Sequence, residues 1–131
     1  MTVGIVCTAL LGLLLFGLGL YVSLLRGRTR RSIGCDTTSP TDPLHRAVRA
    51  HGNTAEYAPF LGLLFLWFAM HPASTWVSVL IVVATAARFL IVAGLLFGPS
   101  LDRPNPMRFS GALLTYLCGL ALVVRLALAW S

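Results

Sequence analysis

Charge is scarce in this chain and unevenly distributed. Of its 131 residues only 14 are charged, four of these are acidic, and all ten basic residues are arginines. Hydrophobic residues make up 57% of the sequence. Because soluble domains carry about a quarter charged residues, the composition excludes an ordinary soluble domain and indicates a membrane protein.

Metal-binding and disulfide patterns are also missing. The cysteines Cys7, Cys35 and Cys118 show no CxxC motif and no spacing with histidine that is typical of zinc ligands. Two of them lie inside apolar runs. We therefore expect neither a disulfide framework nor a metal site.

Long apolar runs dominate what is present. Four are long enough, or nearly so, to cross a hydrocarbon core of about 30 Å at about 1.5 Å per helical residue. We predict a single all-α membrane domain over residues 1–131, a bundle with transmembrane helices at about 3–25, 43–70, 75–97 and 108–130. The second helix begins with Thr41 or Asp42 as its cap and Pro43 at its first position. It ends at a tight His71-Pro72 turn.

The arginines indicate an orientation. Six lie between the first and second apolar runs and two between the third and fourth, which marks the loop at 26–49 as cytoplasmic and both termini as exterior. No basic residue precedes the first run, so we interpret it as a retained helix and not as a signal peptide. The basic loop lacks interleaved aromatic residues, which argues against nucleic acid as a partner and favours membrane lipids with anionic head groups.

The stretch RAVRAHGNTAEYAPF, residues 46–60, holds most of the other polar side chains. At helical spacing, one arc of about 100° contains His45, Arg46, Arg49, Asn53 and Glu56, while His51 faces the opposite way. Arginines bind carboxylates in a forked geometry, and the asparagine and glutamate can accept from an ammonium group. This face suits an amino acid or peptide ligand. Alternatively, the arginines anchor the helix at the interface and Asn53 bonds another helix.

A buried charge in the third apolar run requires a partner. Glu56 and Arg88 lie at nearly equal distances from the His71-Pro72 turn, so they should reach the same depth. An unpaired charge at that depth costs several kcal/mol. We therefore predict an ion pair between Glu56 and Arg88.

The motif RAVRAHGNTAEYAP resembles the signature of the MAPEG family (membrane-associated proteins in eicosanoid and glutathione metabolism), and its close form resembles bacterial members. Arg88 and the segment NPMRFSGALLT extend the resemblance along the whole chain. It implies a homotrimer of four-helix subunits in a bacterial inner membrane, with glutathione bound between neighbouring subunits near the cytoplasmic face.

The resemblance also implies roles for individual residues. Arg49, Asn53 and Glu56 match positions that line the glutathione pocket, and either Arg26 or Arg28 corresponds to an arginine at the end of the first helix. Arg108 matches an arginine placed near the thiol, where its charge would favour the thiolate and so serve catalysis. The chain departs from other members at Gly52, Ile91 and Ala112, where arginine, histidine and tyrosine occur.

Two functions compete at this point. The first is a glutathione transferase-like membrane enzyme that conjugates glutathione to lipophilic electrophiles, or uses it to reduce peroxides. The second is a non-catalytic trimer that binds a lipid or small ligand, or scaffolds a partner. A small four-helix drug exporter has a similar length but needs a membrane-embedded acid in its first helix, and Val3–Leu25 contains none.

Overall fold

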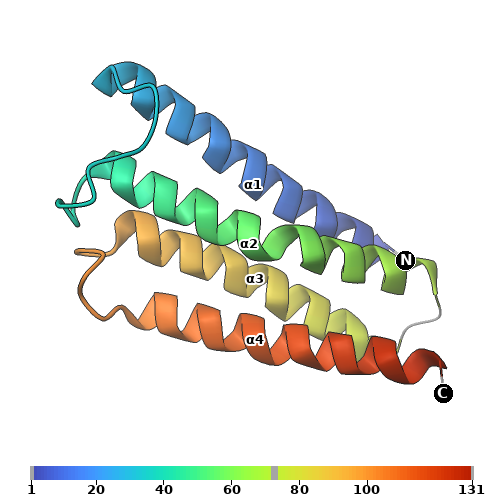
Figure 1. Cartoon of the computed structure of the whole chain (residues 1–131). Helices are drawn as coiled ribbons and strands as arrows, with labels where there is room; N and C mark the ends of the chain where they lie inside the picture. The colour runs from blue at the N-terminus through green and yellow to red at the C-terminus, as the bar shows by residue number, and fades with distance from the viewer. Residues whose placement is uncertain (1, 72–73, 131) are drawn as a thin grey trace.

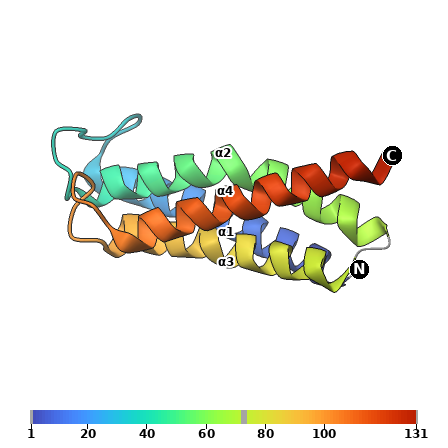
Figure 2. The same cartoon turned by 90° about the horizontal axis from the view of Figure 1, so that it is seen from below.

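The chain forms a bundle of four long helices, α1 (Thr2–Thr29), α2 (Pro43–Met70), α3 (Thr75–Phe97) and α4 (Pro106–Ala127), followed by a short 3-10 helix, η1 (Leu128–Trp130). The structure is a computed structural model and describes residues 2–71 and 74–130. Successive helices lie side by side (Figures 1 and 2), and both termini lie at the end opposite the loops 30–42 and 98–105. We call the end with these two loops the loop end.

The helix boundaries follow the predicted ones closely. The first helix runs four residues beyond the predicted Leu25, to Thr29, because arginine is a good helix former and the Thr29 hydroxyl donates to the Leu25 carbonyl at 3.0 Å. Asp42 caps α2 as expected: its carboxylate accepts from the His45 backbone N–H at 2.7 Å. The predicted turn at Pro72 lies outside the described residues.

The fourth helix begins slightly earlier than predicted. Asn105 is its N-cap: the side-chain oxygen accepts from the backbone N–H of Met107 at 2.9 Å and of Arg108 at 3.4 Å. Pro106 therefore occupies the first helical position, where its missing N–H costs nothing. This cap fixes the position at which the Arg108 side chain projects from α4.

At the end of the bundle opposite the loop end, apolar side chains pack the helices together. Leu11, Phe65, Val77 and Leu122 are almost completely buried in one cluster drawn from all four helices. Nearer the loop end, close packing of α3 and α4 depends on Gly111, because a Cβ atom there would lie 2.6 Å from the Ile91 side chain and 2.9 Å from the Ala87 carbonyl oxygen. Small residues at helix contacts are typical of membrane bundles.

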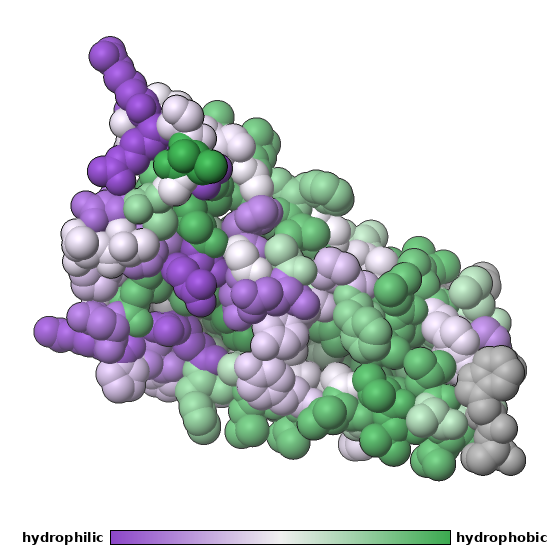
Figure 3. All heavy atoms as spheres, viewed as in Figure 1, coloured by the Kyte–Doolittle hydropathy of each residue, from purple (hydrophilic) through white to green (hydrophobic). Residues whose placement is uncertain are grey.

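The outer surface fits a bilayer. Helices α1, α3 and α4 are long and apolar enough to span a membrane, whereas the first half of α2 is polar. Large apolar side chains face outward along the helices, among them Leu13, Phe16 and Phe109, each at least 70% exposed. Figure 3 shows the hydrophilic residues gathered at the loop end and reaching inward along one face. The chain is therefore an integral membrane protein.

Candidate functional site

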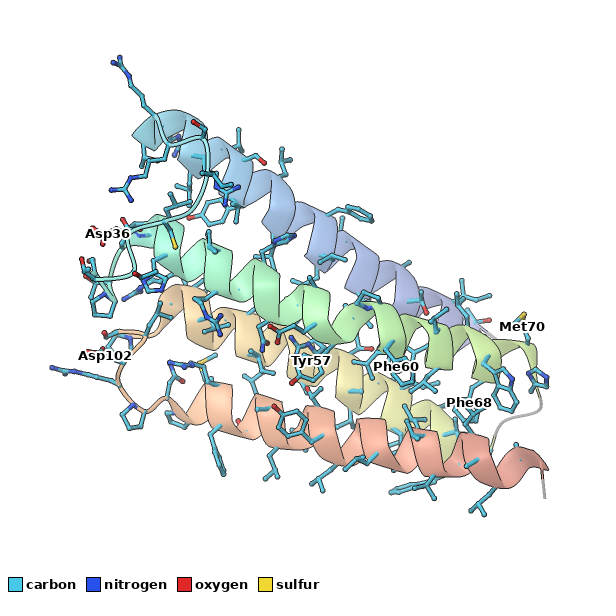
Figure 4. The ribbon with its side chains drawn as sticks, in the orientation of Figure 1. Asp36, Tyr57, Phe60, Phe68, Met70 and Asp102 are labelled. Atoms are coloured by element: carbon cyan, nitrogen blue, oxygen red, sulfur yellow. The ribbon has the colours of Figure 1, made fainter. Side chains whose placement is uncertain are left out.

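A cavity of about 920 Å³ opens between α2, α3, α4 and the loop 98–105. We call it the ionic cavity. One stripe of α2 contributes His45, Arg49, Asn53 and Tyr57, each four residues after the last, so that all four lie on one face. Figure 4 shows Asp102 at the loop end and Tyr57 near the middle of the bundle, which marks the length of the site.

Arg88 forms the inner wall of the cavity. Its side chain is 1% exposed, and one guanidinium nitrogen donates to the Asn53 backbone oxygen at 2.9 Å and to its amide oxygen at 2.7 Å. The guanidinium also lies 4.9 Å from the centre of the Tyr57 ring, within range of a cation–π contact. Oxygen dipoles and a ring face thus stabilise the buried charge.

The predicted ion pair between Glu56 and Arg88 is wrong. Within residues 2–71 and 74–130, Arg88 has no carboxylate at salt-bridge distance, and Glu56 is exposed beside the cavity. The comparison of depth considered how far along the bundle the two residues lie, but not the direction in which each side chain leaves its helix. Asn53, one turn before Tyr57, faces α3, whereas Glu56 points away by about 60° from it at helical spacing.

Arg108 is held at the opposite wall. Its Nη1 donates to the Leu101 carbonyl oxygen at 2.7 Å, and its stem crosses α3 at Gly94, where a Cβ atom would lie 2.9 Å from the Arg108 Cγ. The Leu101 backbone N–H in turn donates to the Pro40 carbonyl oxygen at 3.1 Å. Leu101 therefore links the two loops of the loop end to Arg108.

Arg46 has a different role from the one its position on the polar arc indicated. Its guanidinium donates to the Leu96 carbonyl oxygen at 3.2 Å and to the Pro99 carbonyl oxygen at 2.8 Å, where α3 ends. It satisfies the Leu96 carbonyl, one of the last four of α3 that have no helical donor, and the Pro99 carbonyl of the following loop. The residue therefore secures the loop that forms the cavity rim and does not line the cavity.

The charges around the ionic cavity are strongly unbalanced. Its lining includes four arginines, Arg49, Arg88, Arg103 and Arg108, and one carboxylate, that of Asp102. Arg49 is exposed and, among the described residues, has no hydrogen-bond partner. The Ser100 hydroxyl donates to the Asp102 carboxylate and holds the pKa of that carboxyl below its usual value. The excess of positive charge suits a ligand with more than one anionic group.

The structure brings together some of the predicted glutathione residues and not others. Arg49, Asn53 and Arg108 line the ionic cavity from two helices. Glu56 lines an adjoining groove. Arg26 and Arg28 lie in the last turn of α1, which contributes no residue to the cavity lining. In a single chain, these two arginines stay away from the other predicted site residues.

Two tyrosines of the site were missed in the sequence. Tyr57 and Tyr116 both line the ionic cavity, and their hydroxyl groups lie 3.2 Å apart. Tyr57 continues the four-residue spacing of Arg49 and Asn53, a signal that could have identified it. Tyr116 likewise continues the four-residue spacing of Arg108 and Ala112 on α4, although only the packing of α4 against α2 brings it beside Tyr57. His51 was correctly assigned to the opposite face: it lies against α1 at Gly19.

Comparison with known proteins gives one match. A model of the MAPEG family matches residues 4–128, which is nearly the whole chain. No curated protein and no solved structure matches it significantly.

Proposed function

The chain belongs to the MAPEG family, and from that premise we propose that it is a membrane glutathione transferase-like enzyme. It would act on lipophilic electrophiles or peroxides. The observation that carries the proposal is that Arg108 on α4, far away in the sequence, meets Arg49 and Asn53 of α2 in one cationic cavity. Glutathione offers two carboxylates, an ammonium group and a thiol to such a cavity.

The residues divide the binding work between them. The unpartnered guanidinium of Arg49 would bind a glutathione carboxylate in a forked geometry. The amide of Asn53, held by Arg88, presents a fixed polar group beside it. Arg108 uses one N–H on Leu101, and its remaining N–H groups can donate to the sulfur. Positive charge there stabilises the thiolate relative to the thiol and so raises the fraction of bound glutathione that is present as the nucleophile.

The proposed reaction is a nucleophilic addition. The thiolate sulfur forms a bond to the electrophilic carbon of a conjugated carbonyl compound. The π electrons of the attacked double bond shift to give an enolate, which takes a proton from water. The proton lost by the thiol balances this one. Arg108 favours the first half of the step because it stabilises the anion that attacks.

The complete enzyme would be a homotrimer of the bacterial type in an inner membrane, with the loop 26–49 cytoplasmic and both termini outside. Trimer formation would bring Arg26 or Arg28 of a neighbouring subunit to the mouth of the cavity and cover part of the exposed apolar surface. Membrane lipids would surround the rest and deliver the lipophilic co-substrate.

Titration calorimetry on the detergent-purified protein tests this function. We expect glutathione to bind, and Arg108→Ala to bind it while losing the ultraviolet absorbance of the thiolate. Arg125→Ala is the matched control, because Arg125 is exposed near the other end of the same helix. No binding at millimolar glutathione would exclude the proposal.

A second candidate is a non-catalytic ligand-binding trimer. Ile91 and Ala112 line the ionic cavity, and neither can donate a hydrogen bond to a reacting atom. Glutathione binding with no turnover of any conjugated carbonyl compound or peroxide would favour this alternative.

A further inference from the structure

The ionic cavity adjoins a second hollow of about 300 Å³ between α2 and α4, which we call the apolar groove. Its walls include Phe60, Leu61, Leu64, Leu120 and Val123. Two residues, Tyr57 and Tyr116, line both the cavity and the groove. These tyrosines therefore stand at the boundary between a cationic compartment and a hydrocarbon-like one.

The contact between the two tyrosines is a weak one. Their hydroxyl oxygens lie 3.2 Å apart, and their ring centres lie 5.9 Å apart with the planes at 54°. Hydrogen bonds between hydroxyls are usually about 2.5–3.0 Å long, so this one is long and easily broken. This hydrogen bond lies where the cavity and the groove meet.

The two tyrosines differ in how firmly they are held. Tyr57 is half-buried, and its ring carries the Arg88 guanidinium at 4.9 Å. Tyr116 is 48% exposed on α4. Tyr57 therefore has a buried cation that holds its ring in place, whereas nearly half of Tyr116 faces outward.

We propose that the Tyr57–Tyr116 pair is a gate that selects co-substrates by the length of their apolar part. This inference rests on the proposed glutathione chemistry. A short electrophile fits inside the ionic cavity and leaves the gate closed. One with a long alkyl chain reacts in the cavity only if its chain passes into the apolar groove, so the two hydroxyls must separate.

The test compares two electrophiles with the same reacting group. One is crotonaldehyde, and the other is its decyl homologue, in which a decyl chain replaces the methyl group. Tyr116→Phe removes one of the two hydroxyls, and with it their hydrogen bond, and keeps the ring. We expect it to lower the KM of the decyl homologue about threefold to tenfold, the worth of one hydrogen bond. The KM of crotonaldehyde and the affinity for glutathione are measured alongside, because Tyr116 also lines the ionic cavity, and the KM of the decyl homologue should show the largest change. Tyr21→Phe is the control, since Tyr21 lies on α1 beside a different cavity.

A double-mutant cycle separates a gate from a general structural effect. Tyr57→Phe removes the same hydrogen bond, so the double variant should show no larger change than either single one. Additive changes, equal changes for both aldehydes, or no change at all would overturn the gate.

A measurement without glutathione keeps the gate separate from the proposed function. A decyl diazirine, partitioned into nanodiscs that contain the protein and activated by light, labels residues it can reach. We expect Tyr116→Phe to increase labelling of the α3 segment 88–95, which borders the cavity. Equal labelling in the wild type and the variant would refute the gate, whereas failure of glutathione to bind would refute only the enzyme.

Discussion

The two ends of the bundle are stabilised in different ways. At the end with both termini, apolar side chains pack the helices directly, and α1 approaches α2 closely at Gly4, where a Cβ atom would lie 2.5 Å from the Phe65 carbonyl oxygen. At the loop end, three arginines reach across to backbone oxygens: Arg46 to Leu96 and Pro99, Arg88 to Asn53, and Arg108 to Leu101. The packed end holds the helices together, and the hydrogen-bonded end gives the cavity its shape. Substitutions in the packed end should therefore affect stability alone, whereas substitutions that remove these hydrogen bonds should affect both stability and the cavity.

The largest effect is expected where α3 and α4 pack. Gly111→Leu places side-chain atoms where a Cβ alone already lies 2.6 Å from Ile91, so we expect about 3 kcal/mol or more of lost stability. Thermal unfolding in detergent measures it. Gly17→Leu is the matched control, because a Cβ at Gly17 has no neighbour within 4 Å. Similar losses in both variants would contradict the role of close packing.

The next effect concerns the buried arginine of the cavity. Arg88→Met leaves the Asn53 amide oxygen without its donor and removes the second donor of the Asn53 backbone oxygen, and we expect a loss of about 2 kcal/mol. Glutathione affinity should fall as well, because the Asn53 amide is no longer held. Arg88→Lys should recover part of the stability and less of the affinity, since an ammonium group has no planar fork. Full affinity in Arg88→Met would show that Asn53 needs no support.

A smaller effect is expected for the rim of the cavity. Arg46→Ala frees the carbonyls of Leu96 and Pro99, at a cost of about 1 kcal/mol. Hydrogen exchange should rise in the loop 98–105 and stay unchanged in the apolar cluster. Arg31→Ala, at an exposed arginine, is the control. A rise in exchange spread over the whole bundle would mean that the two ends are not separable.

The smallest effect is expected at the start of α2. Asp42→Ala removes the cap on the His45 backbone N–H, worth about 1 kcal/mol or less in an exposed helix. Circular dichroism should show the loss of less than a turn of helix. Asp42→Asn should retain the cap. If Asp42→Ala abolished glutathione binding, the start of α2 would be more closely coupled to the cavity than the contacts indicate.

The fold was predictable to a large extent because its signals are local. Apolar length set the helices, and a capping side chain followed by proline set the start of α2 at Asp42, whereas the same signal at Asn105 was overlooked and α4 was predicted to begin too late. The end of α1 was placed too early because charge was taken as a helix limit, although arginine extends helices readily.

The site was predictable only in part because its contacts are tertiary. The face carrying Arg49 and Asn53 followed from spacing along one helix. The mistaken pairing of Glu56 with Arg88 came from comparing depth on two helices without knowing their rotation. Tyr116 follows Arg108 and Ala112 at four-residue spacing on α4, but its contact with Tyr57 depends on how α4 packs against α2, which spacing along one helix does not predict.

The link through Leu101 has a consequence for how sequences of this fold can vary. Both of its contacts, from its N–H to Pro40 and from its carbonyl oxygen to Arg108, use main-chain atoms of Leu101. Replacing the Leu101 side chain would therefore leave both hydrogen bonds in place, and what restricts this position is the packing of that side chain against the buried cluster around Ile91 and Leu95. Proline is the exception, because it has no N–H to donate.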